Sequence, residues 1–423
     1  MQQQDKTPDK QAPQNEAYKK ALELLYTCST EHGFLASSTD NLNYRRIWAR
    51  DGVIIGLAGL LTGEPAFSKT LRATLEILAE NQGPHGEIPS NVDPVSKRVS
   101  YGGTTGRVDA NMWFVIGCGE YWRATGDDEF IEKMHSVLEK VRFLLGAWEY
   151  NNRGLLYIPQ AGDWADEYIH HGYVLYDQLL YLQCRRTFRS IHHHIHDTED
   201  HTIIERIAHL KHLITDNYWF SNSNRIPDDV YHEVLYEKGY ETACHCHDLY
   251  WLPYFSPSGY GYRFDTFANI LASLFNVANE HQQQTVDKYI STITNKKLPL
   301  LPAFHPVIEP LSEDWEELQI TFSYTFKNKP YEYHNGGLWS MLTGFYVADL
   351  ARRGQITAAK NYLSAINKAN AMPMNDAPWS FAEYIHGKTL QPGGNTYLCW
   401  SAAATIIGEQ TIAGNTLFRI DDA

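Results

Sequence analysis

Residues 48–61 read WARDGVIIGLAGLL, in which the cluster Trp-Ala-Arg-Asp leads into ten residues that are all small or aliphatic. A helix that is apolar on nearly every side is buried on nearly every side. The next segment, residues 66–79, instead has apolar residues at helical spacing with polar residues between them, which predicts a helix that faces solvent on one side. We therefore expect the fold to be built from a buried helix followed by an amphipathic one.

The same alternation recurs along the chain and predicts twelve helices. We expect an all-α, (α/α)6 toroid of six helical hairpins, with inner helices that all point the same way and minor β structure in the loops. The predicted helices cover residues 15–26, 51–61, 66–79, 109–124, 128–145, 173–188, 199–218, 265–278, 285–294, 337–351, 356–367 and 397–407.

The segments outside these helices complete the predicted organisation. Residues 1–14 are rich in Gln, Lys, Asp and Pro and are expected to be a disordered lead-in, and residues 15–423 a single domain. Residues 154–158 are compatible with a short strand. The connections 219–263 and 295–334 are long for a compact domain, and structureless connections of that length are usually functional loops. We expect both to lie over one end of the toroid.

Polar and aromatic residues gather at or just before the start of the predicted inner helices. Because the inner helices of such a toroid are parallel, we expect the six clusters to share one rim. They occupy residues 48–51, 106–109, 163–168, 264–265, 333–337 and 379–384. We interpret residues 264–265 as a helix cap rather than as part of a site.

Composition limits the possible partners. The formal net charge of −14 disfavours nucleic acid and anionic membranes, and no apolar run approaches the length that spans a bilayer. Residues 1–15 lack the apolar segment of a signal peptide, so we expect a cytoplasmic protein. The aromatic content of 13% fits either a large aromatic core or a site where flat rings stack on a small carbohydrate. The sequence makes no prediction of oligomeric state.

Two carboxylates on this rim are sufficient to split a glycosidic bond. One, held protonated, donates its proton to the leaving oxygen, and the other activates water or attacks the sugar. We choose Asp166 as the acid, because aromatic residues flank it on both sides in the sequence and would raise its pKa by desolvation. We choose Glu383, which also stands among aromatic residues, as the base. The alternative is that Asp166 caps a helix and Glu383 is a surface residue in a loop.

The other residues of the clusters are candidates for holding the sugar. Asp51 fits this role with Arg50 orienting it, but an Asp in a first turn is also favoured by the helix dipole alone. Residues 335–337, Asn-Gly-Gly, would place an amide and backbone N–H groups against hydroxyls, or form a tight turn. The candidate substrate-binding residues are Trp48, Arg50, Asp51, Asp109, Asp163, Trp164, His334, Asn335 and Trp379.

Two tracts look like metal sites, Cys244-His245-Cys246-His247 and His192-His193-His194-Ile195-His196. The first lacks a second paired half at zinc-finger spacing, and the second is a His-rich turn between two predicted helices. We therefore predict no metal and no organic cofactor.

Several motifs resemble those of known glycosidases. Residues 44–52, YRRIWARDG, are similar to the Trp-x-Arg-Asp opening of glucoamylases, debranching-type amylo-α-1,6-glucosidases and the neutral/alkaline invertases of glycoside hydrolase family one hundred. Residues 106–114, GRVDANMWF, resemble the invertase Gly-Arg-Val stretch and the Val-Asp that follows it. Residues 172–180, GYVLYDQLL, resemble the invertase Gly-Tyr-Pro-Ile-Glu-Ile-Gln-Ala-Leu, and residues 333–339, YHNGGLW, resemble Tyr-His-Asn-Gly-Gly-x-Trp.

The two candidate catalytic residues fall within the same resemblance. Trp164-Ala165-Asp166 is similar to the Trp-Met-Asp of debranching enzymes and the Met-Val-Asp of invertases, whose Asp is the general acid. Residues 381–384, FAEY, resemble Pro-Glu-Tyr-Tyr, whose Glu is the base. The resemblance spans nearly the whole chain in order and implies an (α/α)6 glycosidase with Asp166 as acid and Glu383 as base. The chain departs from invertases at Glu167-Tyr168, where they have Arg-Arg, and this bears on specificity for sucrose.

Together these observations predict a hydrolase that releases a terminal sugar from a small α-glucoside, sucrose or a short α-glucan. We prefer inversion, which requires carboxyls about 6.5–9.5 Å apart, over retention at about 5 Å. The nearest alternative enzyme is a sugar 2-epimerase on the same barrel, with His334 and His386 as proton carriers. The alternative from another class is a carbohydrate-binding protein without catalysis.

Overall fold

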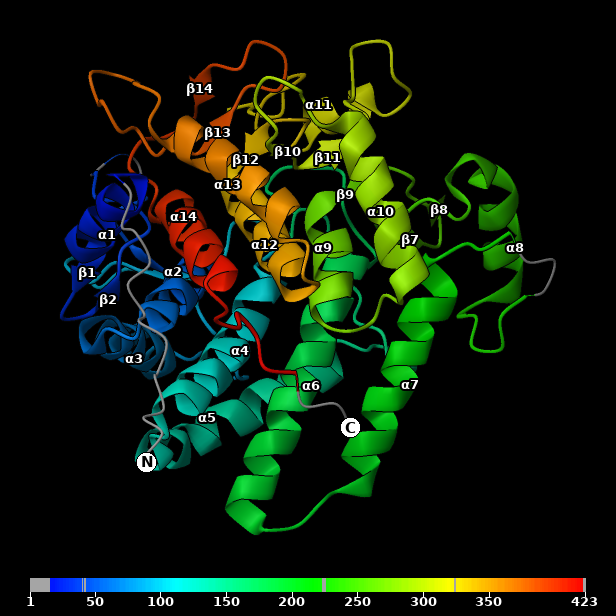
Figure 1. Ribbon diagram of the computed structural model, residues 1–423. Helices are drawn as coiled ribbons and strands as arrows, with labels where there is room; N and C mark the ends of the chain where they lie inside the picture. Colours follow the sequence, from blue (N-terminus) through cyan, green and yellow to red (C-terminus); the bar gives the residue numbers. More distant parts are fainter. Residues whose placement is uncertain (1–15, 40, 42, 223–225, 323–324, 421–423) are drawn as a thin grey trace, which may run out of the picture.

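The computed structural model describes residues 16–39, 41, 43–222, 226–322 and 325–420 (Figure 1). The predicted lead-in, residues 1–14, lies outside them. All twelve predicted helices are present. The inner helices are α2 (Ala49–Thr62), α4 (Val108–Thr125), α6 (Leu175–His196), α9 (Thr266–Leu274), α12 (Ser340–Arg352) and α14 (Cys399–Ile412). The outer helices are α1 (Glu16–Cys28), α3 (Pro65–Glu80), α5 (Asp128–Ala147), α7 (His201–Tyr218), α10 (Glu280–Ile293) and α13 (Ile356–Asn370).

The inner helices form a closed ring. Each packs against the next inner helix along the chain, and α14 packs against α2. In α2, every residue from Ala49 to Gly59 is buried, as its apolar sequence predicts. On α12, Gly344 allows α14 to approach closely, because an added Cβ would lie 2.8 Å from the Cα of Ala404. The predicted (α/α)6 toroid is confirmed.

The outer helices bury one stripe each. In α3 the buried stripe includes Phe67, Leu71, Leu75 and Leu78, spaced so that they fall on one helix face. This face packs against α2 and α4. The outer helices thus cover the ring and leave the ends of the inner helices to the loops.

The two long connections are not structureless, contrary to expectation. The first holds α8 (Glu233–Thr242), a 3-10 turn (Cys244–Cys246), β7 (Tyr254–Ser256) and β8 (Gly259–Tyr260), and the second holds β10 (Leu301–Pro302), β11 (Phe304–His305) and α11 (Trp315–Ile320). Aromatic contacts order the first connection: the ring of Phe220 lies 4.9, 5.6 and 5.0 Å from those of Tyr236, Tyr240 and Tyr260. Figure 1 shows α11 at the end where the inner helices begin, whereas α8 lies at the side of the barrel beside α7.

The β structure is minor, as predicted, and much of it precedes inner helices. Strands β3, β6, β9 and β12 lead directly into α2, α6, α9 and α12, and each belongs to a small antiparallel sheet, so the sheets fix where these helices start. The remaining bounds are β1 Ser29–Thr30, β2 Gly33–Phe34, β3 Ile47–Trp48, β4 Asn91–Val92, β5 Val99–Ser100, β6 Tyr173–Val174, β9 Phe264–Asp265, β12 Leu338–Trp339, β13 Tyr384–Ile385 and β14 Pro392–Gly393.

The strand predicted at residues 154–158 is wrong. This segment makes a single β-bridge, between Ile158 and Gly172. The buried side-chain amide of Gln178 bonds to both the N–H and the carbonyl of Leu156, at 2.9 Å each, and so takes the place of a partner strand. None of the described helices is long and apolar enough to cross a membrane.

Candidate active site

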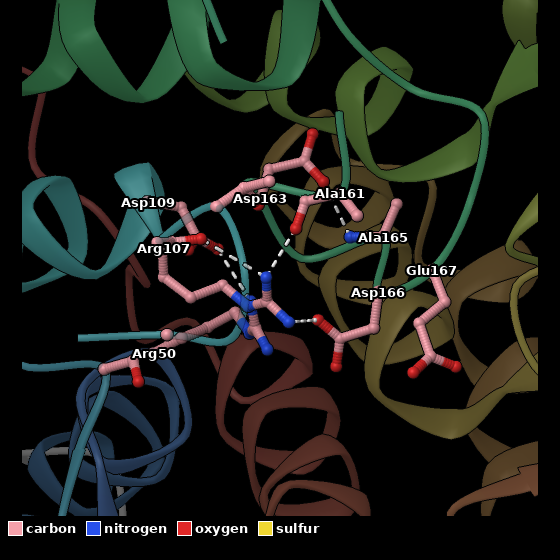
Figure 2. Close-up of polar contacts among 12 residues, drawn as sticks. Arg50, Arg107, Asp109, Ala161, Asp163, Ala165, Asp166 and Glu167 are labelled. Atoms are coloured by element: carbon pink, nitrogen blue, oxygen red, sulfur yellow. Dashed lines mark hydrogen bonds and ion pairs between the residues drawn. The ribbon is translucent and has the colours of Figure 1, made fainter. Parts of the chain in front are cut away.

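Five charged residues from three segments meet at the rim formed by the N-terminal ends of the inner helices (Figure 2). Arg50 lies in the first turn of α2, Asp109 lies in the first turn of α4, and Arg107 is the residue before α4. The loop between α5 and α6 brings Asp163 and Asp166 to the same place. The predicted gathering of separate clusters on one rim therefore holds for these residues.

The loop that carries Asp166 is shaped by Asp163. One oxygen of Asp163 accepts the N–H of Ala165 at 2.8 Å, which forms a tight turn. Its other oxygen lies 3.0 Å from Nδ1 of His170, and both side chains are buried. Burial opposes both charges, but their mutual attraction outweighs it, so the pKa of Asp163 is lowered and the pKa of His170 is raised. Asp163 thus closes the loop from residue 163 to residue 170.

Asp166 is paired with a guanidinium. Its Oδ1 lies 2.5 Å from a terminal nitrogen of Arg107, and its Oδ2 accepts the hydroxyl of Tyr333 at 3.3 Å. The side chain remains 23% exposed. Burial raises the pKa of Asp166, but Arg107 and then Arg50 outweigh burial and hold that pKa below its ordinary value.

The expectation that desolvation by aromatic neighbours raises the pKa of Asp166 was wrong, because the charges of Arg107 and Arg50 outweigh burial. Trp164 packs edge-on against His334, with ring centroids 4.8 Å apart. Tyr168 stacks on Phe304 with ring centroids 4.3 Å apart. The aromatic neighbours of Asp166 in the sequence are thus buried against other rings, while its charge partner, Arg107, comes from the segment before α4.

Glu383 lies in a different kind of environment, made of neutral hydrogen-bond donors. It is 4% exposed, and it accepts the hydroxyl of Tyr44 at 2.6 Å and the backbone N–H of Asn395 at 3.0 Å. Gly394, with φ 73°, leaves the space that a Cβ would take from the Glu383 carboxylate. Burial raises the pKa of Glu383, and the bonds from Tyr44 and Asn395 offset this only in part. The negative charge of Asp166 also raises the pKa of Glu383.

Arg50 pairs with Asp109 rather than chiefly with Asp51. Its Nη1 lies 2.7 Å from Asp109, whereas its Nε lies 4.0 Å from Asp51. The hydroxyl of Tyr176 donates to the same Asp109 oxygen at 3.1 Å. Burial raises the pKa of Asp51 to about 6, with Arg50 lowering it and the charges of Asp166 and Glu383 adding to the rise. Asp51 is thus close enough to both candidate catalytic carboxyls to be influenced by them.

Several buried polar atoms at this rim lack a hydrogen-bond partner among the described residues. Among them are the two ring nitrogens of His334, Nε1 of Trp164 and Nε of Arg50. His334 is 1% exposed and stacks on Trp339 with an interplanar angle of 11°. Burial lowers the pKa of His334 to about 3, so the ring is neutral and carries one donor and one acceptor nitrogen. Such a pair matches the hydroxyl group, which both donates and accepts.

Asn335 is occupied by the backbone. Its oxygen accepts the N–H of Ile308 at 2.7 Å, and its nitrogen donates to the carbonyls of Ile308 and Asn328 at 2.9 and 3.1 Å. Asn328, which sequence reasoning missed, donates to the carbonyls of Asp166 and Glu167 at 3.2 and 2.7 Å and accepts the N–H of His334 at 3.1 Å. These two amides tie the Asp166 loop to the segment that carries His334.

The side chains of the two other candidate tryptophans make no hydrogen bond to this network among the described residues. Trp48 is half-buried and donates through its Nε1 to the carbonyl of Asn43 at 3.1 Å. Trp379 lines a groove of about 510 Å³ with residues of α1, α13 and α14, including Leu363 and Ile412. The structure therefore does not bring Trp379 together with Asp166.

Sequence reasoning also left Arg107 and Tyr44 without a role, although both stand inside motifs that resemble those of glycosidases. The two Cys/His tracts are unrelated to the rim. Within the part of the chain that the structure describes, no three His, Cys, Asp or Glu side chains are grouped as a metal-ligand set.

Comparison with known proteins agrees with this geometry. A family model described as alkaline and neutral invertase matches residues 16–414. A probable alkaline/neutral invertase D of Arabidopsis thaliana is 23% identical over 88% of this chain and 76% of its own length. Cytosolic invertase 1 of Oryza sativa subsp. japonica is 21% identical over 89% of this chain and 73% of its own.

Solved structures show the same fold. A bacterial glucoamylase complexed with acarbose superposes with a TM-score of 0.64 and 15% identity, over 95% of this chain and 56% of the other. The GH63 mannosylglycerate hydrolase of Thermus thermophilus superposes with a TM-score of 0.63 and 14% identity, over 92% of this chain and 99% of the other. With the family model covering almost the entire described chain, the protein is a glycosidase that belongs to the alkaline and neutral invertase family.

Proposed function

We propose that residues 15–423 act as one catalytic domain that hydrolyses a small α-glucoside, sucrose or a short α-glucan, and releases its terminal sugar with inversion. In this proposal Asp166 is the general acid and Glu383 the general base. The observation that carries it is that Tyr333 links the two segments: its hydroxyl donates to Asp166 at 3.3 Å, and its ring lies 6.1 Å from that of Tyr384, the residue after Glu383. The relatives named as invertases support sucrose as the first substrate to test.

The surroundings of each carboxyl suit different steps. Glu383 must be ionised to take a proton from water, and the donors Tyr44 and Asn395 stabilise its ionised form. Asp166 must be protonated to deliver a proton to the leaving oxygen, so its ion pair with Arg107 has to loosen when the substrate enters. Arg107 would then face the part of the substrate that leaves.

We assign contact with the sugar to Asp51, Trp164 and His334, whose polar atoms lie beside Asp166 or lack a protein partner among the described residues. A neutral His334 would bind one hydroxyl as donor and another as acceptor. Trp48, half-buried at the start of α2, remains a candidate for stacking on the sugar.

The other predicted binding residues fit positioning roles better. Arg50 and Asp109 are paired with each other, Asp163 is used by the turn and by His170, and Asn335 is saturated by backbone groups. Trp379 is left out of the proposed site, because its groove is formed by other helices.

The histidines do not favour the epimerase alternative. His334, with its pKa lowered to about 3, holds no transferable proton near neutral pH. The Nδ1 of His386 accepts the N–H groups of Lys388 and Thr389, at 3.1 and 3.3 Å, and its ring stacks on Tyr331. A pair of histidines acting on opposite faces of one sugar is therefore not supported.

The test is hydrolysis of sucrose, isomaltose and maltose by the purified protein and by its Asp166→Asn and Glu383→Gln variants. We expect release of free glucose from at least one of these substrates, and loss of this activity in both variants. Glu139→Gln on α5, whose carboxylate pairs with Arg142 on the outer surface, is the matched control and should keep full activity. Binding without product in every version would instead support the non-catalytic alternative.

The stereochemical proposal has its own readout. Proton NMR of the first product distinguishes β-glucose, expected from inversion, from α-glucose, expected from retention. Initial α-glucose would refute inversion while leaving hydrolysis intact.

We also propose a cytosolic location, because one relative is named as cytosolic. Other relatives are named as chloroplastic or mitochondrial. Fractionation of the source cells with an antibody to the protein tests this, and recovery in an organelle fraction would refute it.

A further inference from the structure

A second cavity lies at the opposite end of the barrel from the rim. It has a volume of about 650 Å³ and lies among the C-terminal end of α4, the second half of α6 and the segment after α14. Figure 1 shows this last segment leaving α14 and running past α4 towards α6. Cavities of roughly 300–1,000 Å³ are the size that holds small molecules.

The lining of this cavity is rich in arginine although the chain as a whole carries a net charge of −14. Arg123, Arg186, Arg189 and Arg419 line it without any lysine, against the two acids Asp197 and Glu199. A guanidinium presents two parallel N–H groups to two oxygens of one phosphate, which a lysine ammonium does not. The composition therefore matches a phosphate group better than a general negative charge.

The arginines are held in place from outside the cavity. Arg186 is buried, and its Nη1 donates to the carbonyl of Phe275 at 2.8 Å. Arg419 follows Phe418, which is buried against Phe275 and Phe345 with ring centroids 5.2 and 6.2 Å apart. Side chains from two inner helices and the C-terminal segment thus converge on one cavity.

In one of the ion pairs at the cavity, a ligand can compete with the acidic partner for the arginine. Arg189 makes two hydrogen bonds to Glu199, each 3.1 Å, at the exposed edge. The side chains of Arg189 and Glu199 are 22% and 40% exposed, so solvent and salt partly screen the pair and an anion can compete with Glu199 for Arg189. Arg123 is bound by Glu120 and is better suited to setting the local field than to direct contact.

Aromatic and histidine side chains complete the lining. The ring of Trp122 lies 4.8 Å from that of His194, and both line the cavity together with His193. These histidines belong to the His192–His196 tract, which the proposed hydrolysis does not use. Trp122 offers a flat apolar surface for the organic part of a ligand.

The cavity is too far from the rim to take part in hydrolysis. Trp122 follows Arg107 by 15 residues on α4, and at about 1.5 Å per residue the two are roughly 22 Å apart. A molecule bound there would not touch Asp166. We propose that this cavity is a separate binding site for a small phosphate ester, such as a sugar phosphate or a nucleoside monophosphate.

The experiment is isothermal titration calorimetry of the full-length protein with inorganic phosphate, glucose 6-phosphate and AMP at millimolar concentration. We expect at least one of the two esters to bind. The double variant Arg189→Ala/Arg419→Ala should weaken that binding by at least about tenfold, since each lost guanidinium removes charge-assisted hydrogen bonds.

The matched control is Arg142→Ala/Arg206→Ala, which removes two exposed arginines outside the cavity and should change the affinity less than about twofold. Thermal unfolding of both double variants shows whether they remain folded, and their glycosidase activity should equal that of the unmodified protein. Absence of binding by both esters, binding of inorganic phosphate alone, or equal weakening in the two double variants would each overturn the proposal.

Discussion

Asp166 and Glu383 lie at the same rim, but their surroundings shift the pKa values of the two carboxyls in opposite directions. Asp166 is paired with the guanidinium of Arg107 and its pKa is lowered, whereas Glu383 is more deeply buried among neutral donors and its pKa is raised. In the proposed roles, the group that gives up a proton, Asp166, is thus the stronger acid of the two in the free protein. The group that must accept one is the weaker acid.

Because of this difference, the proposed roles require the less populated distribution of protons between Asp166 and Glu383. The productive state has Asp166 protonated and Glu383 ionised, and the free protein favours the reverse. In such a case the acidic limb of the kcat/KM profile follows Asp166 and the alkaline limb follows Glu383. Substrate binding, by displacing Arg107, would restore the productive order.

The largest effect is expected from a substrate whose leaving group needs no proton. Asp166→Asn should lower kcat on a natural α-glucoside by about 10²–10⁴-fold but keep activity on α-glucosyl fluoride within about tenfold of the unmodified enzyme, whereas Glu383→Gln should lose both by about 10²–10⁴-fold. Steady-state rates with the two substrates measure this. The opposite pattern would exchange the two roles and make Glu383 the acid.

The next effect concerns the ion pair of Asp166. Arg107→Met removes the cation that lowers the pKa of Asp166, so that pKa rises and the acidic limb of kcat/KM moves to higher pH. Arg107→Lys, which keeps the charge, should move the limb less. If Arg107→Met leaves the acidic limb unchanged, that limb does not report the ionisation of Asp166.

Asp51, which is influenced by both carboxyls, offers a test through stability. Burial raises its pKa from 3.8 to about 6 in the folded protein. A raised carboxyl pKa destabilises the folded state as pH rises from about 4 through 6. Asp51→Asn should therefore gain roughly 2–3 kcal/mol in stability relative to the unmodified protein at pH 8 compared with pH 4.

Denaturant unfolding of Asp51→Asn at the two pH values measures this difference. Asp376→Asn, on an exposed loop, controls for the loss of one carboxylate. Equal stability changes for Asp51→Asn at pH 4 and pH 8 would show that the fold does not raise the pKa of Asp51.

The smallest effect is expected at Tyr44. Tyr44→Phe removes a hydrogen bond that lowers the pKa of Glu383, so this pKa rises further and the alkaline limb of kcat/KM moves to higher pH. We expect a fall in kcat of about tenfold or less, as for the loss of one hydrogen bond. A shift of the acidic limb instead would show that Glu383, and not Asp166, governs the acidic limb.

The ring of helices could be predicted because the sequence of an inner helix such as α2 is apolar on nearly every side, which indicates burial on every side. The helices α8 and α11 could not, because they bury little and show no clear apolar period: α11 buries only Leu318. Their order depends on contacts with other loops.

The site was predicted in part for the same reason. Asp166 and Glu383 stand in recognisable motifs, but their partners are far away in the chain: 339 residues separate Tyr44 from Glu383, and 162 separate Asp166 from Asn328. The pKa of Asp166 was mispredicted because neighbours in the sequence were taken for neighbours in space. The assignment of catalytic roles to the two carboxyls remains a prediction for the experiments above.

The closure of the ring by α14 has a consequence for how the protein assembles during its synthesis. Both α1 and α2 can pack against α14 only after residues 399–412 have been synthesised. The bond from Tyr44 to Glu383 joins the same two ends. A ribosome-bound chain that lacks α13 and α14 therefore carries Asp166 without the closed ring, so the proposed site assembles only after these two helices have been synthesised.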